Sequence, residues 1–257
     1  MKKKQIIHFF VILLTSLVIV CCKSKPFHHS KIDGKNITIT SEISSNENIN
    51  AFVAPYTQHI NKDLNTKISF ATVTFDKSKG QWHSNIGNLF ALATYEMGNP
   101  VFKNREKLSI DMVMLNHGGI RAIISKGDVT IRTAFDVMPF ENSLYIVGLS
   151  SKEIYELANY MLSEKKPHPL YGIEITVNSI TNNIENIKIN NQPIEDNKIY
   201  YVATSDYLAN GGDSMTFFSN SNIKYDLDYK IRNILIDYFK KHPTLSEINS
   251  QHIIFTN

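Results

Sequence analysis

The spacing of apolar residues along the chain, helical in some segments and alternating or continuous in others, predicts its secondary structure. Apolar positions recur at helical spacing in four segments, which are residues 49–64, 85–95, 150–163 and 227–241. Short apolar or alternating runs bounded by turn residues predict strands at residues 69–75, 110–115, 128–131, 142–148, 172–177, 184–189 and 200–204. A short helix or turn is expected over residues 133–138. Because strands and helices do not alternate regularly, the pattern favours an α+β fold with helices that cover sheets.

Cap and breaker residues refine this pattern. Ser150 followed by Glu153 forms a capping box at the start of the third helix. In the first helix, Asn46 or Asn48 is a candidate cap, and Pro55 lies about two turns inside, which predicts a kink or a later start. Residues 23–45 are polar without a sustained period, so we expect a tether with a short strand at residues 37–40.

The N-terminus reads as a targeting segment. Three lysines at residues 2–4 precede a short apolar run at residues 9–20, the order found in secretory signals. The run is short for a membrane span, although an uncleaved anchor is the alternative. Because Cys21 and Cys22 follow, the segment resembles a bacterial lipoprotein signal. We expect lipidation at Cys22 (or Cys21) and a membrane-anchored protein that is periplasmic or on the cell surface.

This interpretation divides the chain into three parts. They are a lipoprotein signal peptide at residues 1–22, a polar tether at residues 23–45 and one domain at residues 46–257. The two cysteines both lie in the signal region, so we expect neither a disulfide nor a thiol metal site in the domain.

The composition excludes some classes of partner. The 257 residues carry a net charge of +3 without a basic stripe, which predicts no nucleic-acid binding. The adjacent histidines His28 and His29 have no carboxylate cluster beside them, so they are expected to belong to a solvated linker rather than a metal site.

Three polar segments follow or precede predicted strands. They are Asn116–Arg121 (NHGGIR), Pro139–Asn142 (PFEN) and Ser205–Asp213 (SDYLANGGD). Glycines at a strand end let the backbone reach positive φ and approach a ligand closely. An arginine offers a fork of donors to a phosphate. Together, aromatic rings for stacking, amides, an arginine and a carboxylate are what a nucleotide requires.

Each segment also has a simpler structural interpretation. Gly-Gly pairs usually mark turns. Phe140 and Tyr207 are of residue types that mostly pack in cores, and Arg121 alone is usually a surface charge. Asp213 after two glycines is equally a turn or cap residue. The occurrence of all these groups at strand ends favours the ligand-binding interpretation.

The ordered motifs carry a family resemblance. NHGGIR, then GDVT, MPFEN and TSDYLANGGDSMTFF resemble the C-terminal, substrate-binding domain of the 5′-nucleotidases over about residues 46–245. NIGNLFA is similar to the helix that opens that domain, and residues 49–64 lie where the family has its interdomain helix. The resemblance implies a four-layer α-β-β-α sandwich and a nucleotide or nucleoside ligand.

The resemblance also implies roles for individual residues. Phe140 and Tyr207 would sandwich the base, although the family usually has phenylalanine at the second place. Asp213 would accept from the ribose hydroxyls, and Arg121 would serve the phosphate. His117 receives no role, because the family usually has a small residue there. The implied substrate-binding residues are Asn116, Gly118, Gly119, Arg121, Phe140, Asn142, Tyr207, Gly212 and Asp213.

The sequence departs from the family in two ways. The arginines that usually precede the NIGNL helix are missing, and Lys77 or Lys79 would have to replace them with a point charge. Full-length members also carry a metallophosphoesterase domain with two metal ions, and this chain has no D-x-H or G-N-H-[DE] motif. We therefore expect no catalytic residues and no cofactor in this chain, with divalent metals in a partner.

Three hypotheses follow. The chain is the substrate-binding half of a split nucleotidase that acts with a separate metallophosphoesterase chain. Alternatively, it is a non-catalytic nucleotide- or nucleoside-binding lipoprotein. In the third hypothesis, the fold serves protein interaction and binds no nucleotide, which the missing arginines favour.

Overall fold

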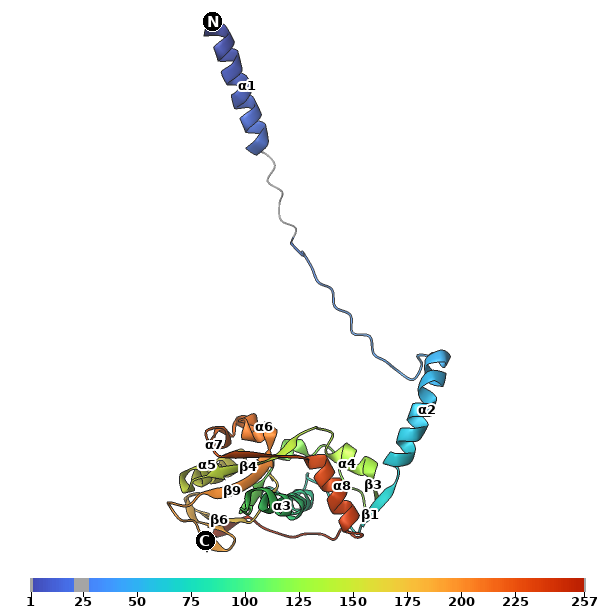
Figure 1. Cartoon of the computed structure of the whole chain (residues 1–257), viewed down its shortest axis with the longest axis vertical. Coiled ribbons are helices and arrows are strands. Elements are labelled where there is room, and N and C mark those ends of the chain that lie inside the picture. The colour runs from blue at the N-terminus through green and yellow to red at the C-terminus, as the bar shows by residue number, and fades with distance from the viewer. Residues whose placement is uncertain (1, 21–27, 257) are drawn as a thin grey trace. The chain divides into compact units, whose positions relative to one another are not determined.

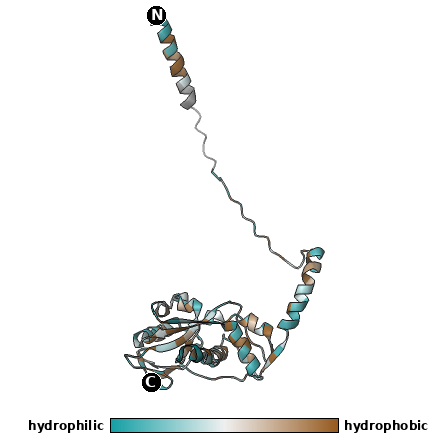
Figure 2. Cartoon of the chain, viewed as in Figure 1, coloured by the Kyte–Doolittle hydropathy of each residue, from teal (hydrophilic) through white to brown (hydrophobic). Residues whose placement is uncertain are grey.

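The structure, a computed structural model, describes residues 2–20 and 28–256 (Figure 1). The chain divides into two compact units, Met1–Asn50 and Ala51–Asn257. The first contains helix α1 (Lys2–Val20), part of which is brown, the colour of hydrophobic residues, in Figure 2. Cys21 and Cys22, the predicted lipidation sites, lie outside the described residues. No helix in the described ranges combines the length and apolar character that a membrane span needs.

The short strand predicted at residues 37–40 is wrong. These residues have no regular structure and are exposed, and no neighbouring strand pairs with them. An isolated strand would leave its backbone groups to water alone, so residues 37–40 gain no hydrogen bonds from an extended strand.

Helix α2 (Glu47–Leu64) begins ahead of Pro55 and continues through it. Asn46 is the cap, because its Oδ1 atom accepts from the backbone N–H groups of Asn48 (3.0 Å) and Ile49 (3.2 Å). The helix buries none of its residues. Its apolar side chains are therefore open to solvent.

The second unit contains three sheets. The largest has five strands in the order β10 (Lys224–Lys230), β4 (Ser143–Leu149), β9 (Tyr200–Ser205), β2 (Met112–Met114) and β5 (Leu170–Tyr171). The next has four strands in the order β11 (Ile253–Thr256), β6 (Ile173–Asn178), β7 (Ile184–Ile189) and β8 (Gln192–Pro193). A small sheet pairs β1 (Lys67–Ala71) with β3 (Gly127–Thr130).

Two cores lie on opposite faces of the five-stranded sheet. On one face, α3 (Asn85–Glu106) and α8 (Ile231–Lys241) share a core with Val113 of β2. On the other, Met112 and Met114 share a core with the four-stranded sheet. This second core is completed by α5 (Ser151–Glu164), α6 (Asp206–Ala209) and α7 (Thr216–Ser219). The alternation along β2 follows from the two-residue period of a strand, and the predicted α+β class is confirmed.

Helix α5 agrees with its sequence pattern. Ser150 Oγ accepts from the backbone N–H of Glu153, and the Glu153 carboxylate accepts from the N–H of Ser150 at 2.7 Å. Ile154, Leu157 and Met161 lie on the apolar face of this helix, and their side chains are fully buried. The predicted capping box is therefore confirmed.

Some element boundaries differ from the prediction. Helix α3 continues past residue 95 to Glu106, because Phe102 in its extension is buried in the first core. Residues 224–230, partly predicted as helix, form β10, since this segment pairs with β4. Strand β1 ends at Ala71, and beyond it Phe75 makes an isolated bridge to Ile124. The short helix α4 covers Ile131–Val137.

Candidate functional site

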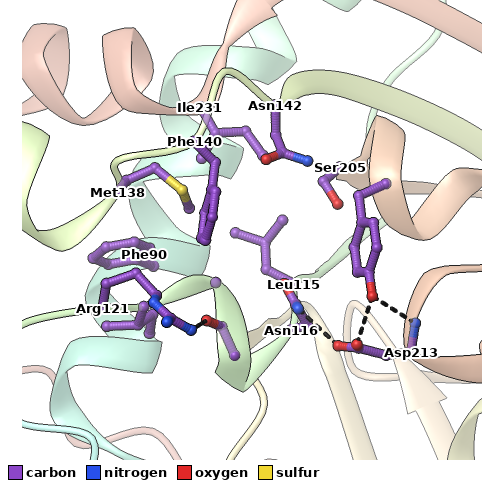
Figure 3. A pocket seen from close by; sticks show the side chains of 14 residues that line it. Phe90, Leu115, Asn116, Arg121, Met138, Phe140, Asn142, Ser205, Asp213 and Ile231 are labelled. Atoms are coloured by element: carbon purple, nitrogen blue, oxygen red, sulfur yellow. Dashed lines mark hydrogen bonds between the residues drawn. The ribbon is translucent and has the colours of Figure 1, made fainter. Parts of the chain in front are cut away.

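A cavity of about 280 Å³ opens at one edge of the five-stranded sheet (Figure 3). Its lining residues are Phe90, Leu115, Asn116, Gly118, Gly119, Ile120, Arg121, Met138, Phe140, Asn142, Ser205, Tyr207, Asp213 and Ile231. In Figure 3, Phe140 and Arg121 lie on one side of the cavity, and Ser205 and Asp213 lie on the other. The cavity thus unites the three polar segments that the sequence singled out.

Strand direction explains why the three segments meet. Strands β2 and β9 are parallel neighbours, so the chain leaves both at the same edge of the sheet. Strand β4 is antiparallel to β9, and Leu144 near its start lies opposite Ser205 at the end of β9. The segment before β4 therefore reaches the edge where the segments after β2 and β9 begin.

The glycine loop after β2 forms a short 3₁₀ helix, His117–Gly119. Gly118 and Gly119 do not have positive φ, so this part of the prediction is wrong. The lack of a side chain matters instead, because a Cβ atom on Gly119 would lie 2.8 Å from Asn116 Oδ1. The close approach of Asn116 to the loop is what requires glycine.

Lys77 supports this loop from outside the cavity. Its Nζ atom donates to the carbonyl oxygens of Ile120 (2.5 Å) and His117 (3.3 Å). Burial and the charge of Arg121 lower the pKa of Lys77. Lys77 does not line the cavity, and its amine instead stabilises the glycine loop through these two hydrogen bonds. Lys79 makes no comparable contact among the described residues.

Both aromatic rings of the site are open to solvent. Phe140 is 42% exposed and Tyr207 is 47% exposed, which is unusual for rings that pack in a core. The Arg121 guanidinium lies 5.6 Å from the centre of the Phe140 ring, a cation–π distance, and its Nη1 atom donates to Gly118 O at 3.3 Å. The arginine thus stands between the ring and the glycine loop.

Arg232, which the sequence analysis did not identify, holds the segment that carries Phe140. This buried arginine donates to the carbonyl oxygens of Pro139 and Phe140 and forms an ion pair with Glu141. Its guanidinium lies 4.1 Å from the centre of the Phe135 ring. No local pattern around residue 232 distinguishes this arginine from a surface one.

The amide of Asn142 is oriented by a carboxylate. Its Nδ2 atom donates to Asp206 Oδ1 at 2.8 Å, and the same oxygen accepts from the N–H of Tyr207 at 2.7 Å. Among the described residues, the amide oxygen of Asn142 remains available to accept from a ligand.

The carboxylate of Asp213 lies at the far side of the cavity. Its Oδ1 atom accepts from the Tyr207 hydroxyl at 2.8 Å, and its Oδ2 atom accepts from Asn116 Nδ2 at 2.7 Å. The bond to Asp213 raises the pKa of the Tyr207 hydroxyl. Gly212, which precedes Asp213, does not line the cavity, but a Cβ atom there would lie 2.5 Å from the Tyr207 ring.

A histidine pair lies behind the glycine loop. His168 Nδ1 accepts from the backbone N–H of His117 at 3.2 Å. Burial lowers the pKa of His168 to about 4, and burial also lowers the pKa of His117. Within the described part of the chain, no group of three or more histidine, cysteine, aspartate or glutamate side chains could hold a metal ion.

The structure therefore gathers the predicted site residues at one cavity, with Gly212 as the single exception. The sequence analysis missed its apolar floor, which includes Leu115, Met138 and Ile231. Ser205 was named only as the start of a polar segment. The sequence analysis also missed Arg232 and Tyr160, whose hydroxyl donates to the backbone carbonyl of Asp213 at 2.9 Å. Phe90, on helix α3, is buried and lines this cavity. The binding roles of the lining residues remain predictions.

The chain belongs to the family described as 5′-nucleotidase, C-terminal domain, which matches residues 63–220. It is 29% identical over 193 residues to the trifunctional nucleotide phosphoesterase YfkN of Bacillus subtilis, covering 69% of this chain and 13% of that protein. It is 24% identical to the protein UshA of Yersinia enterocolitica, covering 84% of this chain and 38% of that protein.

Solved structures agree on the fold. The 5′-nucleotidase precursor of Thermus thermophilus has a TM-score of 0.66 and 21% identity, covering 80% of this chain and 42% of that one. The Haemophilus influenzae NAD nucleotidase has a TM-score of 0.61 and 21% identity, covering 82% of this chain and 41% of that one. This chain thus spans less than half the length of each of these proteins.

Proposed function

We propose that this chain is the nucleotide-binding, substrate-specificity half of a split 5′-nucleotidase that hydrolyses phosphomonoesters in nucleotide catabolism. A separate metallophosphoesterase chain supplies the metal ions and the hydrolytic chemistry. The observation that carries the proposal is the single cavity of about 280 Å³ in which two exposed rings, a guanidinium and a carboxylate meet. A nucleotide offers a complementary group to each of them.

Each part of a nucleotide has a matching group in the cavity. Phe140 and Tyr207 stack on the faces of the base, which is sequence-tolerant because every base has a π face. Arg121 binds the phosphate with its planar fork of donors. Asp213 accepts hydrogen bonds from the ribose hydroxyls, which are strengthened by its charge.

The orientation of Asn142 adds a preference at the base. Since its Nδ2 atom already donates to Asp206, the side chain offers an acceptor to the cavity. A base edge that carries an N–H donor, such as an exocyclic amine, meets this acceptor. A base edge that carries only acceptors gives no donor to the Asn142 oxygen, so neither the base acceptor nor the Asn142 oxygen forms a hydrogen bond there.

Several observations support a partner chain. The sequence has no D-x-H or G-N-H-[DE] motif, whereas two-metal hydrolysis needs several histidine and carboxylate ligands together. Helix α2 also exposes an apolar stripe, as expected for a surface that contacts another protein. The stripe consists of Ile49, Phe52, Val53, Tyr56 and Ile60. We propose that the metallophosphoesterase chain covers it.

The proposed protein is an exported, membrane-anchored lipoprotein that is periplasmic or on the cell surface. The lysines at residues 2–4 and the apolar segment that follows support export, and a lipid on Cys22 (or Cys21) anchors the chain. Such an anchor keeps a nucleotide-binding subunit where extracellular nucleotides arrive.

Calorimetric titration of the full chain in detergent with AMP, without metal, tests the nucleotide site. We expect heat of binding and no release of phosphate by this chain alone. Capture of the tagged chain from its native membrane, followed by mass spectrometry, then tests the partner. We expect a metallophosphoesterase chain and phosphate release from AMP in the captured material when a divalent metal is added.

The outcomes separate the competing functions. Binding of AMP without any captured metallophosphoesterase would favour a non-catalytic nucleotide-binding lipoprotein. Release of phosphate by the purified chain alone would refute the split arrangement. A protein that binds neither AMP nor adenosine would refute the nucleotide site, leaving the fold as an interaction module.

A further inference from the structure

Asp213 has a left-handed backbone conformation, which is uncommon for residues other than glycine. Its φ is 52° and that of Ser214 is 62°, so two consecutive residues with side chains adopt the left-handed region. Such conformations persist where surrounding contacts hold them, and they occur often at functional sites. The contacts around Asp213 therefore show which interactions stabilise this conformation.

The hydroxyl of Tyr207 contacts Asp213 at two atoms. It donates to Oδ1 at 2.8 Å and accepts from the Asp213 backbone N–H at 3.2 Å. The ring can lie this close because Gly212 has no side chain, since a Cβ atom there would lie 2.5 Å from the ring. Tyr207 thus fixes both the backbone and the carboxylate of the residue that faces the cavity.

Tyr160 of α5 contacts Asp213 from the side away from the cavity. Its hydroxyl donates to the Asp213 backbone carbonyl at 2.9 Å, and it does not line the cavity. Its ring packs edge-on against Phe217, with 5.8 Å between the ring centres, so its own position is fixed by the second core. Asp213 is therefore held at its N–H, its carbonyl and both carboxylate oxygens.

The carboxylate of Asp213 can accept further hydrogen bonds beyond those from Tyr207 and Asn116. A carboxylate has about four lone-pair sites, two on each oxygen. Tyr207 takes one site on Oδ1, and Asn116 takes one on Oδ2. One acceptor site thus remains on each oxygen, which suits a ligand with two adjacent hydroxyl donors.

We propose that the hydroxyls of Tyr207 and Tyr160 are positioning groups that fix Asp213 for a vicinal diol and so give the site its preference for ribose over deoxyribose ligands. This inference rests on the proposed nucleotide-binding function. Tyr207 then has two separable roles, because its ring stacks on the base while its hydroxyl orders the carboxylate. Pre-ordering a binding group raises affinity by reducing the entropy lost on binding.

The test compares adenosine with 2′,3′-dideoxyadenosine, which keeps the base and lacks the diol. Calorimetric titration of the full chain in detergent is carried out for wild type, Tyr207→Phe and Tyr160→Phe. We expect Tyr207→Phe to weaken adenosine binding by about tenfold, the scale of one hydrogen bond to a charged group, and to change dideoxyadenosine binding by less than about twofold. Tyr160→Phe changes adenosine binding in the same direction, although it cannot touch the ligand.

Two controls isolate the effect. Tyr155→Phe removes a hydroxyl from a 42% exposed tyrosine of the same helix, α5, and we expect it to bind both ligands as wild type does. In an Asp213→Ala background, Tyr207→Phe should have no further effect on adenosine, because the positioned group is gone.

The results distinguish this inference from the proposed function. Equal loss of adenosine and dideoxyadenosine binding in Tyr207→Phe would overturn the inference, since it would reflect a change in stacking or folding. Unchanged adenosine binding in both tyrosine variants would overturn it as well. If wild type binds no nucleoside or nucleotide at all, the proposed function itself fails, and the inference fails with it.

Discussion

The ring of Phe140 provides the most direct test of base stacking. Phe140→Ala removes one wall of the cavity and the cation–π partner of Arg121. Stacking of a base on an aromatic side chain contributes about 1–3 kcal/mol by alanine substitution. At roughly 1.4 kcal/mol per factor of ten, the dissociation constant for AMP should rise about 5- to 150-fold.

The weaker AMP binding expected for Phe140→Ala should not result from unfolding of the variant. Phe140 is 42% exposed, so truncation removes less buried area than in a core phenylalanine, for which the cost is about 3–5 kcal/mol. Phe70→Ala is the matched control, because Phe70 is 38% exposed on β1 and does not line the cavity. Both variants are compared by thermal unfolding, and AMP binding is measured by calorimetric titration.

The result that would refute the stacking role is specific. AMP affinity within about twofold of wild type in Phe140→Ala would show that the ring contributes no stacking on the scale of about 1–3 kcal/mol. An equal loss in Phe70→Ala would attribute the effect to stability. Phe140→Trp, which keeps an aromatic face, should retain binding.

Three further changes test other parts of the site. Arg121→Ala should weaken AMP binding by about tenfold or more and leave adenosine binding unchanged, and equal titration losses would contradict a phosphate role. Gly212→Ala places a Cβ atom 2.5 Å from the Tyr207 ring and should weaken adenosine binding, whereas Gly34→Ala, with nothing within 4 Å, should not. His168 has a folded pKa of about 4, below its usual 6.5, so the unfolded chain binds the proton first as pH falls. Between pH 7 and pH 4 this difference in pKa lowers the free energy of unfolding by about 3 kcal/mol. His168→Asn should abolish this loss when stability is measured by urea unfolding. Identical pH profiles of stability for wild type and His168→Asn would contradict the prediction.

Local patterns predicted the elements whose contacts are also local. Helix α5 was expected at residues 150–163 and covers Ser151–Glu164, because its cap and its apolar face are both encoded within the segment. Strand β7 covers the predicted residues 184–189. Residues 227–230 were assigned to a helix, since Leu227 and Ile231 suggest a helical period, while pairing of β10 with β4 decides the structure.

The site shows the same division between local and long-range information. Motif order identified Arg121, Phe140 and Asp213, and strand direction brings them to one cavity. The groups that hold these residues could not be predicted, because Tyr160 and Arg232 act across long sequence separations. A tyrosine on the side of a helix and an arginine in a helical turn have no local feature that reveals such a contact.

The C-terminal strand has a practical consequence for the design of shortened proteins. The family match ends at residue 220, but β10, α8 and β11 follow it, and β11 pairs in parallel with β6 from Ile253–Ile175 to Thr256–Asn178. A truncation at the family boundary would remove the outer strands of both large sheets and uncover the core face beneath α8. Unpaired edges and exposed apolar surface favour aggregation. A soluble variant should therefore extend through residue 256, with any purification tag placed at the other end.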